Sequence, residues 1–169
     1  RPERTIMSVL IVIPARYQSS RYPGKPLVAL TGVSGVSKSL IERSWDAAKA
    51  VTGVDRVVVA TDDVRIQQAA EAFGADVVMT SSECLNGTER CAEAHAALGD
   101  SYDIVVNLQG DAPLTPPHFV TQLIQHLQAD QAADIATPVV QLSWQELDKL
   151  RAYKQKTPFS GTTAIIDPQ

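Results

Sequence analysis

Cysteine and long apolar runs are scarce in this sequence. Only two of the 169 residues are cysteines, Cys84 and Cys91, which is too few for a disulfide framework. The longest apolar stretch, residues 9–13, is far shorter than the roughly 20 residues that cross a bilayer. We therefore expect free thiols, a cytoplasmic location and no association with membranes.

The motifs of several common enzyme classes are also missing. There is no GxGxxG loop for a dinucleotide and no GxSxG turn for a nucleophilic serine. The three histidines, His95, His118 and His126, have no metal-ligand spacing with one another or with cysteine. The sequence thus argues against a dinucleotide oxidoreductase, a serine hydrolase and a zinc site.

Acidic residues are absent from residues 5–41, although the whole chain carries a net charge of −4. This stretch contains Arg16, Arg21, Lys25 and Lys38, of which we interpret Lys38 as solvated surface charge. A mostly acidic protein lacks the broad basic face of nucleic-acid binders, so we expect no nucleic-acid partner. A local group of cations suits one compact anion instead.

Strand-like and helix-like segments alternate along the chain. Between the first strand and the first helix, residues 14–36 are rich in proline and glycine and predict a long structured loop. We expect Asp62 to cap the second helix and Phe119 to face the core. The predicted strands are 8–13, 56–60, 76–80, 104–108, 135–140 and 162–166, and the predicted helices are 37–51, 63–73, 88–98, 116–127 and 144–150.

This alternation predicts a Rossmann-like, doubly wound, mostly parallel α/β sheet with helices on both faces. Ligands of such sheets bind beyond the carboxyl ends of the strands, where the strand order reverses. In a 3-2-1-4 order, the strands at residues 8–13 and 104–108 are neighbours. The loops that follow these two strands would then face one crevice.

The loop after the first strand, residues 14–27, has the composition of a phosphate-binding loop. It carries Arg16, Arg21 and Lys25 together with hydroxyl groups and proline or glycine turns. Arginine forks, a lysine charge and free backbone N–H groups are what a phosphate chain requires. The loop is not a Walker loop, because Pro26 stands where serine or threonine would coordinate magnesium.

The loop after the strand at residues 104–108 reads Gln109-Gly110-Asp111. Asp111 would stand at the carboxyl end of that strand, facing the crevice. Magnesium takes oxygen ligands and often only one or two carboxylates, with phosphates supplying the rest. A carboxylate beside a cationic loop therefore indicates a metal–phosphate site, and the alternative is that Asp111 only caps a turn.

Five segments together resemble the 3-deoxy-D-manno-octulosonate (Kdo) cytidylyltransferases, also called CMP-Kdo synthetases. In chain order these segments are IPARYQSSRYPGKPL (13–27), VVVATDD (57–63), EAFGADVVMTS (71–81), NGTERCAE (86–93) and VVNLQGDAPLTPP (105–117). CMP-sialate synthetases share the fold, but their first loop differs from RYPGKPL. The resemblance covers most of residues 8–140 and implies an α/β sheet of the nucleotidyltransferase type.

The resemblance implies magnesium-dependent transfer of CMP from CTP to Kdo for lipopolysaccharide or capsule synthesis, and a homodimer for the full-length protein. Residues 88–90 could alternatively serve only to cap a helix. The implied roles are triphosphate binding by Arg16, Lys25 and Arg21, cytosine and ribose recognition by Ala15, Arg16, Gly87, Thr88 and Arg90, magnesium binding by Asp111 and sugar contact by Gln109. Arg16, Lys25 and Asp111 are the catalytic candidates among them.

The sequence departs from the family pattern at three places. Ala112 stands where the family usually has glutamate, and residues 31–38 replace a short turn. The chain also ends at Gln169, before the second half of the family pattern, so we expect an incomplete C-terminus. We interpret residues 1–7 as a leader or cloning remnant and residues 8–169 as the nucleotide-binding part. The alternatives are a non-catalytic nucleotide-binding module or a cytidylyltransferase for a related ulosonate, 8-amino-Kdo or sialate.

Overall fold

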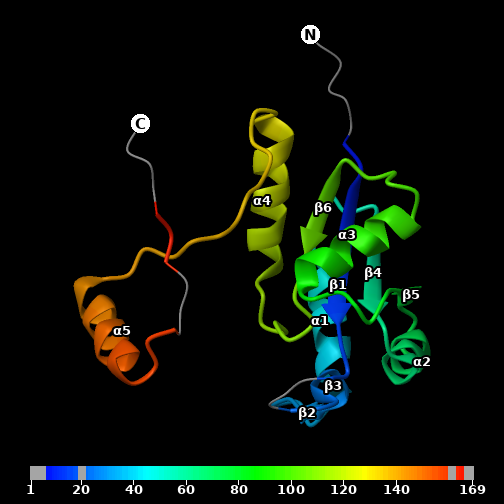
Figure 1. The fold of residues 1–169 in the computed structure, drawn as a ribbon, viewed down its shortest axis with the longest axis horizontal. Helices are drawn as coiled ribbons and strands as arrows, with labels where there is room; N and C mark the ends of the chain where they lie inside the picture. Colours follow the sequence, from blue (N-terminus) through cyan, green and yellow to red (C-terminus); the bar gives the residue numbers. More distant parts are fainter. Residues whose placement is uncertain (1–6, 19–21, 160–162, 166–169) are drawn as a thin grey trace. The chain divides into compact units, whose positions relative to one another are not determined.

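The computed structural model describes residues 7–18, 22–159 and 163–165. Internal contacts divide the chain into two units, residues 1–136 and residues 137–169. Strands and helices alternate along the first unit (Figure 1), as the sequence predicts. Assignment of residues 8–169 to one nucleotide-binding part stays a prediction. Met7, which we placed in the leader, is in fact half-buried against the core.

The central sheet consists of four parallel strands. They are β1 (Val9–Ala15), β4 (Arg56–Thr61), β5 (Asp76–Met79) and β6 (Ile104–Asn107), in the order β5-β4-β1-β6. Numbered along the chain within this sheet, that order is 3-2-1-4, which confirms the prediction. β1 therefore pairs with both β4 and β6, and the chain segments after β1 and β6 leave the sheet side by side.

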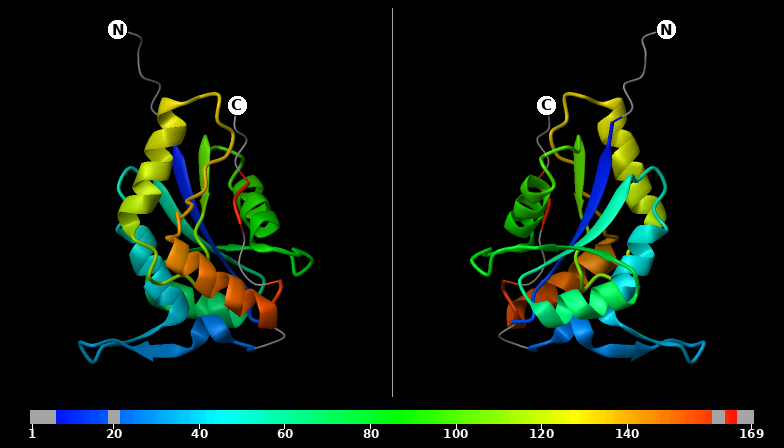
Figure 2. Two further views of the ribbon diagram at one scale, coloured as in Figure 1. Left: turned by 90° about the vertical axis from the view of Figure 1, so that its left-hand side faces the viewer. Right: turned by 90° about the vertical axis from the view of Figure 1, so that its right-hand side faces the viewer.

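Helices cover both faces of the sheet. One face carries α1 (Leu40–Lys49), α2 (Val64–Ala72) and α4 (Pro117–Ala129), and the opposite face carries α3 (Gly87–Ala97). Figure 2 shows α1 and α4 on one side of the strands and α3 on the other. The doubly wound α/β prediction is thus confirmed. None of the helices in the described residues has the length and apolar character needed to cross a membrane.

Strand β1 is buried along its whole length. Ile11 and Ile13 pack into the cluster under α1, α2 and α4, whereas Leu10 and Val12 pack into the cluster under α3. A fully buried side chain of this size contributes about 1.5–3 kcal/mol through the hydrophobic effect. Burial on both faces explains why the apolar run shows no alternation in the sequence.

The predicted loop at residues 14–36 contains more structure than expected. β2 (Ala29–Thr31) pairs antiparallel with β3 (Ser37–Ser39) to form a small hairpin. The helix predicted from residue 37 instead begins at Leu40, so that part of the prediction was wrong. Ser39 caps it, since its hydroxyl accepts a hydrogen bond from the Glu42 N–H at 3.3 Å.

The second helix is capped one residue later than predicted. Asp63, not Asp62, is the N-cap, and its carboxylate accepts from the Arg65 N–H at 2.9 Å. The Arg65 guanidinium, which also bonds this carboxylate, lowers the pKa of Asp63. Asp62 turns instead toward Arg90. At the other end Gly74, with φ of 85°, follows the helix and suits its C-terminus.

Two further expectations for the later part of the chain were wrong. Phe119 is 45% exposed, whereas Val120 and Ile124 on the same helix are buried. Residues 135–140 form no strand, and their apolar side chains are exposed. β-propensity did not produce a strand there, because an isolated strand leaves its backbone groups unpaired. Residues 163–165 have no regular structure, and the rest of the strand predicted at 162–166 lies outside the described residues.

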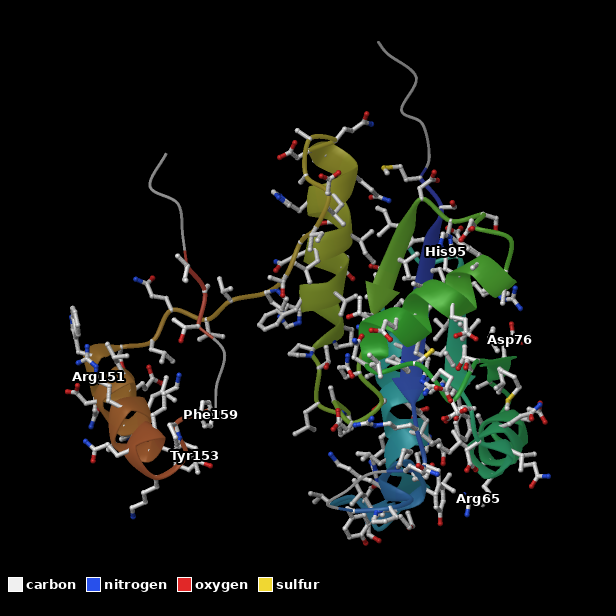
Figure 3. All side chains as sticks on the ribbon, in the orientation of Figure 1. Arg65, Asp76, His95, Arg151, Tyr153 and Phe159 are labelled. Carbon is white, nitrogen blue, oxygen red and sulfur yellow. The ribbon has the colours of Figure 1, made fainter. Side chains whose placement is uncertain are left out.

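The described part of the second unit contains one helix, α5 (Trp144–Lys156), which extends six residues beyond the predicted end. Ser143 and Glu146 form a capping box, and the Ser143 hydroxyl lowers the pKa of Glu146. Figure 3 shows the side chains of this helix, including Arg151 and Tyr153. Its last turns are rich in lysine and other good helix formers, which explains the extra length.

Candidate functional site

A cleft of about 630 Å³ opens at the carboxyl ends of β1 and β6. This is the position where doubly wound sheets bind ligands. Three chain segments supply its walls: the loop after β1, the turn that leads into α3, and the loop after β6. The lining residues are Pro14–Arg16, Tyr22, Lys25, Pro26, Cys84–Gly87, Arg90 and Gln109–Asp111.

Lys25 and Asp111 meet inside this cleft. The Lys25 Nζ lies 2.6 Å from the Asp111 Oδ2, and the two side chains are 47% and 53% exposed. The two residues are 86 positions apart and come from the two loops that were predicted to share a crevice. Their contact confirms that the cationic loop and the acidic loop face each other.

The cationic loop is shaped by a stack of three groups. The Tyr17 ring lies against the Arg65 guanidinium, whose central carbon is 3.3 Å from the ring centroid. On Gly24, a Cβ would come within 3.1 Å of the same ring, and the Gly24 φ of 73° also favours glycine. Lys25 follows directly in a short 3₁₀ turn, η1 (Lys25–Leu27), so the stack fixes where the lysine emerges.

The acidic loop is packed closely against the end of β1. A Cβ on Gly110 would lie 2.8 Å from the Pro14 carbonyl oxygen and 3.1 Å from the Ile41 Cδ1. On the other side, the buried Ser44 hydroxyl donates to the Gly110 carbonyl at 2.9 Å. Asp111 is therefore attached to a turn that α1 and β1 hold in place.

Replacing Gly110 by alanine is expected to lower the free energy of unfolding by about 1–3 kcal/mol, because the new methyl group forces backbone apart. Urea unfolding of the full chain measures this change. The neighbouring exposed variant Gln109→Ala is the control, with an expected change within about 0.5 kcal/mol. Equal midpoints for Gly110→Ala and the unmodified chain would contradict the close packing.

The third wall of the cleft is the N-terminus of α3. Asn86 caps this helix by accepting from the Glu89 N–H at 3.0 Å. Gly87 lines the cleft, and a Cβ there would come within 3.0 Å of the Gln109 Nε2. Gln109 therefore lies against the helix N-terminus. Thr88 is exposed and is not among the described residues that line the cleft.

The other predicted site residues fall as follows. Ala15, Arg16, Gln109 and Arg90 line the cleft together with Lys25, Asp111 and Gly87. Arg90 is also buried, with 3% exposure. Arg21 lies outside the described residues. Of the nine predicted positions, Thr88 is therefore the one described residue that the structure leaves out of the cleft wall.

Sequence reasoning missed Ser44 and Cys84. Ser44 shares the buried face of α1 with Leu40, Ile41 and Ala48, and a serine among apolar residues at helical spacing was the available signal. Cys84 was expected only to be a free thiol, but it lines the cleft, and its thiol donates to Glu93 at 3.0 Å.

The site has few metal-binding groups of its own. No cluster of three or more histidine, cysteine or acidic side chains is found among the residues that the structure describes. Asp111 is half-exposed and faces the open cleft beside a cation. A single accessible carboxylate fits a magnesium ion that takes its remaining ligands from phosphates and water, and it does not fit a closed structural metal site.

Comparison with known proteins places the chain among nucleotide-transferring proteins. A family model described as cytidylyltransferase matches residues 10–157. A 3-deoxy-manno-octulosonate cytidylyltransferase of Maricaulis maris is 48% identical over 95% of this chain and 60% of its own length. The mitochondrial protein of the same name from Arabidopsis thaliana is 48% identical over 79% of this chain and 44% of its own.

The solved structures agree with the sequence comparison. A CMP:2-keto-3-deoxy-manno-octonic acid synthetase complexed with CTP matches with a TM-score of 0.68 and 43% identity, over 74% of this chain and 49% of that one. A cytidylyltransferase from Leptospira borgpetersenii matches with a TM-score of 0.62 and 26% identity, over 74% and 50%. The chain spans about half the length of the curated relatives that it matches.

Proposed function

This chain belongs to the cytidylyltransferase family, and on that premise we propose that it transfers CMP from CTP to the anomeric hydroxyl of Kdo. The observation that carries the proposal is the Lys25–Asp111 contact of 2.6 Å in the cleft beyond β1 and β6. It brings a cation for phosphate and a carboxylate for metal to one place. The names of the relatives, Kdo cytidylyltransferases at 48% identity, support the choice of nucleotide and sugar.

Arg16, Lys25 and Arg21 bind the triphosphate in this proposal. Arg16 and Lys25 line the cleft from the loop after β1, where an incoming phosphate chain finds two positive charges. The Lys25–Asp111 pair is half-exposed, so exchanging the carboxylate for a phosphate costs little. Arg21 is included because it belongs to the same loop.

The nucleoside occupies the wall formed by α3 and the end of β1. Backbone groups of Ala15 and Arg16, the helix N-terminus at Gly87 and the Arg90 guanidinium line that wall and offer hydrogen-bond donors. Thr88 is exposed and is not among the described residues that line the cleft, so this wall does not support the nucleoside contact expected of it. Gln109, in the Asp111 loop, lies against this wall at Gly87, and we place the sugar acceptor beside it.

Asp111 holds the magnesium ion that the proposed reaction uses. When bound, the ion neutralises phosphate charge and orients the triphosphate. The Ser44 hydrogen bond and the close packing of Gly110 hold the backbone beside Asp111 in place.

The proposed reaction is an in-line displacement at phosphorus. The anomeric hydroxyl oxygen of Kdo attacks the α-phosphorus of CTP and loses its proton to solvent. The bond between the α-phosphorus and the bridging oxygen of the β-phosphate breaks, and pyrophosphate leaves with the electron pair. No covalent bond to the protein forms. Arg16 and Lys25 neutralise the charge that builds on the departing phosphates, and catalysis of this type depends mainly on such positioning and neutralisation.

Release of pyrophosphate tests the proposal. The chain is incubated with CTP, Kdo and magnesium, and pyrophosphate is measured by a coupled assay. We expect release that depends on both substrates. Release with 8-amino-Kdo or sialate but not with Kdo would show that the proposed acceptor sugar is wrong, whereas the proposed transfer of CMP would stand.

A second candidate is a nucleotide-binding module without transferase activity. Ala112, in the place of a glutamate in the resembling sequences, favours it. This candidate predicts CTP binding by calorimetry without pyrophosphate release under any acceptor. Turnover by this same chain would rule it out.

Location and assembly stay predictions as well. We propose a cytoplasmic protein, because both cysteines are free and CTP is the substrate. The homodimer is supported only by the family resemblance. Size-exclusion chromatography with light scattering would report the oligomeric state of the chain.

CTP is expected to protect Cys84 from alkylation. Cys84 lines the cleft, whereas Cys91 is buried and its burial raises its pKa to about 12. Iodoacetamide labelling, followed by mass spectrometry, should modify Cys84 before Cys91. CTP at about ten times its dissociation constant should slow the labelling of Cys84 roughly tenfold, because bound CTP blocks access of the reagent to the cleft.

The pH dependence of this labelling follows from the thiol environment. Burial, and then the Glu93 carboxylate, raise the pKa of Cys84 above its ordinary value of 9.0. Because only the thiolate reacts, the labelling rate should still be rising as the pH passes 9. Faster labelling of Cys91 than of Cys84 in the folded chain, or no protection by CTP, would contradict the assignment.

A further inference from the structure

Arg90 is the only charged residue that is buried within the described part of the chain, and it also lines the cleft. Its exposure is 3%. A buried guanidinium is costly unless its charge and its N–H groups are matched inside the protein. The groups that match it therefore decide what Arg90 can offer to a ligand.

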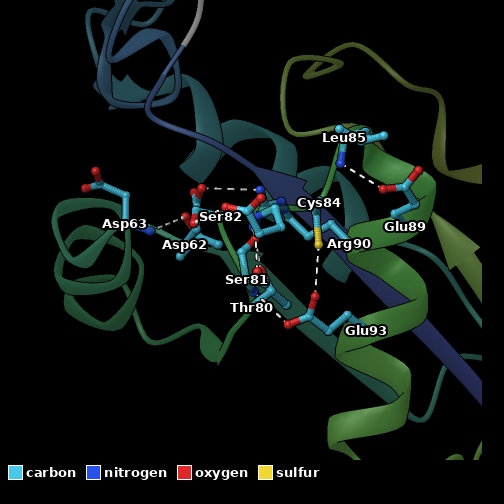
Figure 4. Close-up of polar contacts among 12 residues, drawn as sticks. Asp62, Asp63, Thr80, Ser81, Ser82, Cys84, Leu85, Glu89, Arg90 and Glu93 are labelled. Atoms are coloured by element: carbon cyan, nitrogen blue, oxygen red, sulfur yellow. Dashed lines mark hydrogen bonds and ion pairs between the residues drawn. The ribbon is translucent and has the colours of Figure 1, made fainter.

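The partners of Arg90 come from the ends of two neighbouring strands. Its Nη2 lies 3.4 Å from the Asp62 Oδ2, just beyond β4. Its Nη1 donates to the Thr80 hydroxyl and, at 3.3 Å, to the Ser81 carbonyl, just beyond β5. Figure 4 draws these contacts around the guanidinium. Among the described residues, two hydrogen bonds and one ion pair engage three of the five N–H donors of arginine, which leaves two for a ligand.

This ion pair differs from the other one in the cleft. Lys25 and Asp111 are each about half exposed, whereas the side chains of Arg90 and Asp62 are 4% and 19% exposed. An exposed pair exchanges partners at little cost, but breaking a buried pair leaves an uncompensated charge. We therefore expect the Arg90–Asp62 ion pair to persist when a ligand binds. Because Asp62 balances its positive charge, the guanidinium acts as a fixed hydrogen-bond donor rather than as a phosphate-binding cation.

We propose that Asp62 and Thr80 are positioning residues that hold the Arg90 guanidinium so that its remaining N–H groups meet a carbonyl oxygen of the pyrimidine ring. This inference rests on the proposed function for the nucleotide and the cleft. Asp62 is available for the role because Asp63 caps α2 in its place. Neither Asp62 nor Thr80 is among the described residues that line the cleft, so both act through Arg90.

Two probes separate this role from general damage to the site. CTP engages the nucleoside wall and the phosphate loop, whereas tripolyphosphate engages the phosphate loop alone. Calorimetry on the full chain, with magnesium, is expected to give about tenfold weaker CTP binding for Asp62→Asn and for Thr80→Val. Tripolyphosphate binding should stay within about twofold for both variants, and Thr80→Ser should restore CTP affinity.

The control is Asp76→Asn, which removes the charge from another aspartate–arginine pair at the same sheet. Asp76, labelled in Figure 3, pairs with Arg56 at 3.0 Å, and neither residue is among those that line the cleft. This variant should change neither affinity. If Asp62→Asn fails to fold, the Thr80→Val and Thr80→Ser pair still decides the question. Unchanged CTP affinity in Thr80→Val, or an equal loss for both probes, would overturn the inference.

Failure of the proposed function gives a different result. If the unmodified chain binds UTP or a purine nucleotide more tightly than CTP, the cytidine assignment is wrong. The variants are then read with the preferred nucleotide. If the variants bind a preferred pyrimidine nucleotide more weakly and tripolyphosphate unchanged, the role of Asp62 and Thr80 is supported. If the weakened nucleotide is a purine, or if no nucleotide binds more weakly, the role is overturned.

Discussion

Replacing Lys25 by alanine is expected to slow pyrophosphate release roughly 100- to 1,000-fold, which is the usual effect of losing one donor aimed at transition-state charge. The affinity for CTP should fall much less, because Arg16 and the nucleoside wall remain. Lys25 lies 2.6 Å from Asp111, at the point where the triphosphate and the metal are proposed to meet. The measurement compares kcat from the coupled assay with the dissociation constant of CTP from calorimetry.

Lys38→Ala is the matched control for this experiment. Lys38 belongs to the same acid-free stretch, but it pairs with Glu42 and Asp46 on α1 and does not line the cleft. These partners raise the pKa of Lys38, with the Asp46 hydrogen bond as the larger cause. Its removal should leave kcat unchanged. An unchanged kcat in Lys25→Ala would remove Lys25 from the reacting centre.

The sheet could be predicted because burial controls it. β1 and β4 are largely buried apolar runs between turn signals, and a strand buried on two faces must be apolar on both. β6 has the same apolar composition, but it is the edge strand and Val105 is 38% exposed. Once the strands alternate with helices, right-handed crossovers leave few possible orders, and 3-2-1-4 is the observed one. The contact between the loops after β1 and β6 follows from that order.

The errors occur where local rules compete on nearly equal terms. Asp62 and Asp63 are both good caps, and one residue of difference decided which of them reaches Arg90. Ser37 and Lys38 suit a helix start or a strand, and pairing with residues 29–31 made them a strand. Residues 135–140 have strand composition, but they pair with no strand in the described structure.

The site was only partly readable from the sequence for a related reason. Lys25 and Asp111 are charges in loops that follow apolar strands, and their position in the sequence already indicates a crevice. Arg90 lies on a helix, and nothing in its local sequence shows that it is 3% exposed or that Thr80 and Asp62 surround it. Long-range partners of a buried charge depend on the finished packing.

Asp111→Asn is expected to abolish magnesium-dependent pyrophosphate release, with a loss of at least about 100-fold. The amide keeps the shape of the side chain but removes the negative charge that attracts a divalent cation. The same change leaves Lys25 without its carboxylate partner at 2.6 Å. Without magnesium, the variant should therefore bind tripolyphosphate more tightly than the unmodified chain, by a few-fold at low ionic strength.

The opposite signs of these two effects make the test specific. A variant that only disturbs the loop, such as Gly110→Ala, should lower magnesium-dependent pyrophosphate release and should also weaken magnesium-free tripolyphosphate binding. Asp134 is exposed and is not part of the cleft wall, so Asp134→Asn is the charge-matched control. It should change neither the magnesium-dependent release nor the magnesium-free binding of tripolyphosphate. Full magnesium-dependent release by Asp111→Asn would show that another group holds the metal. Weaker magnesium-free binding of tripolyphosphate would show that the carboxylate does not compete with phosphate for Lys25.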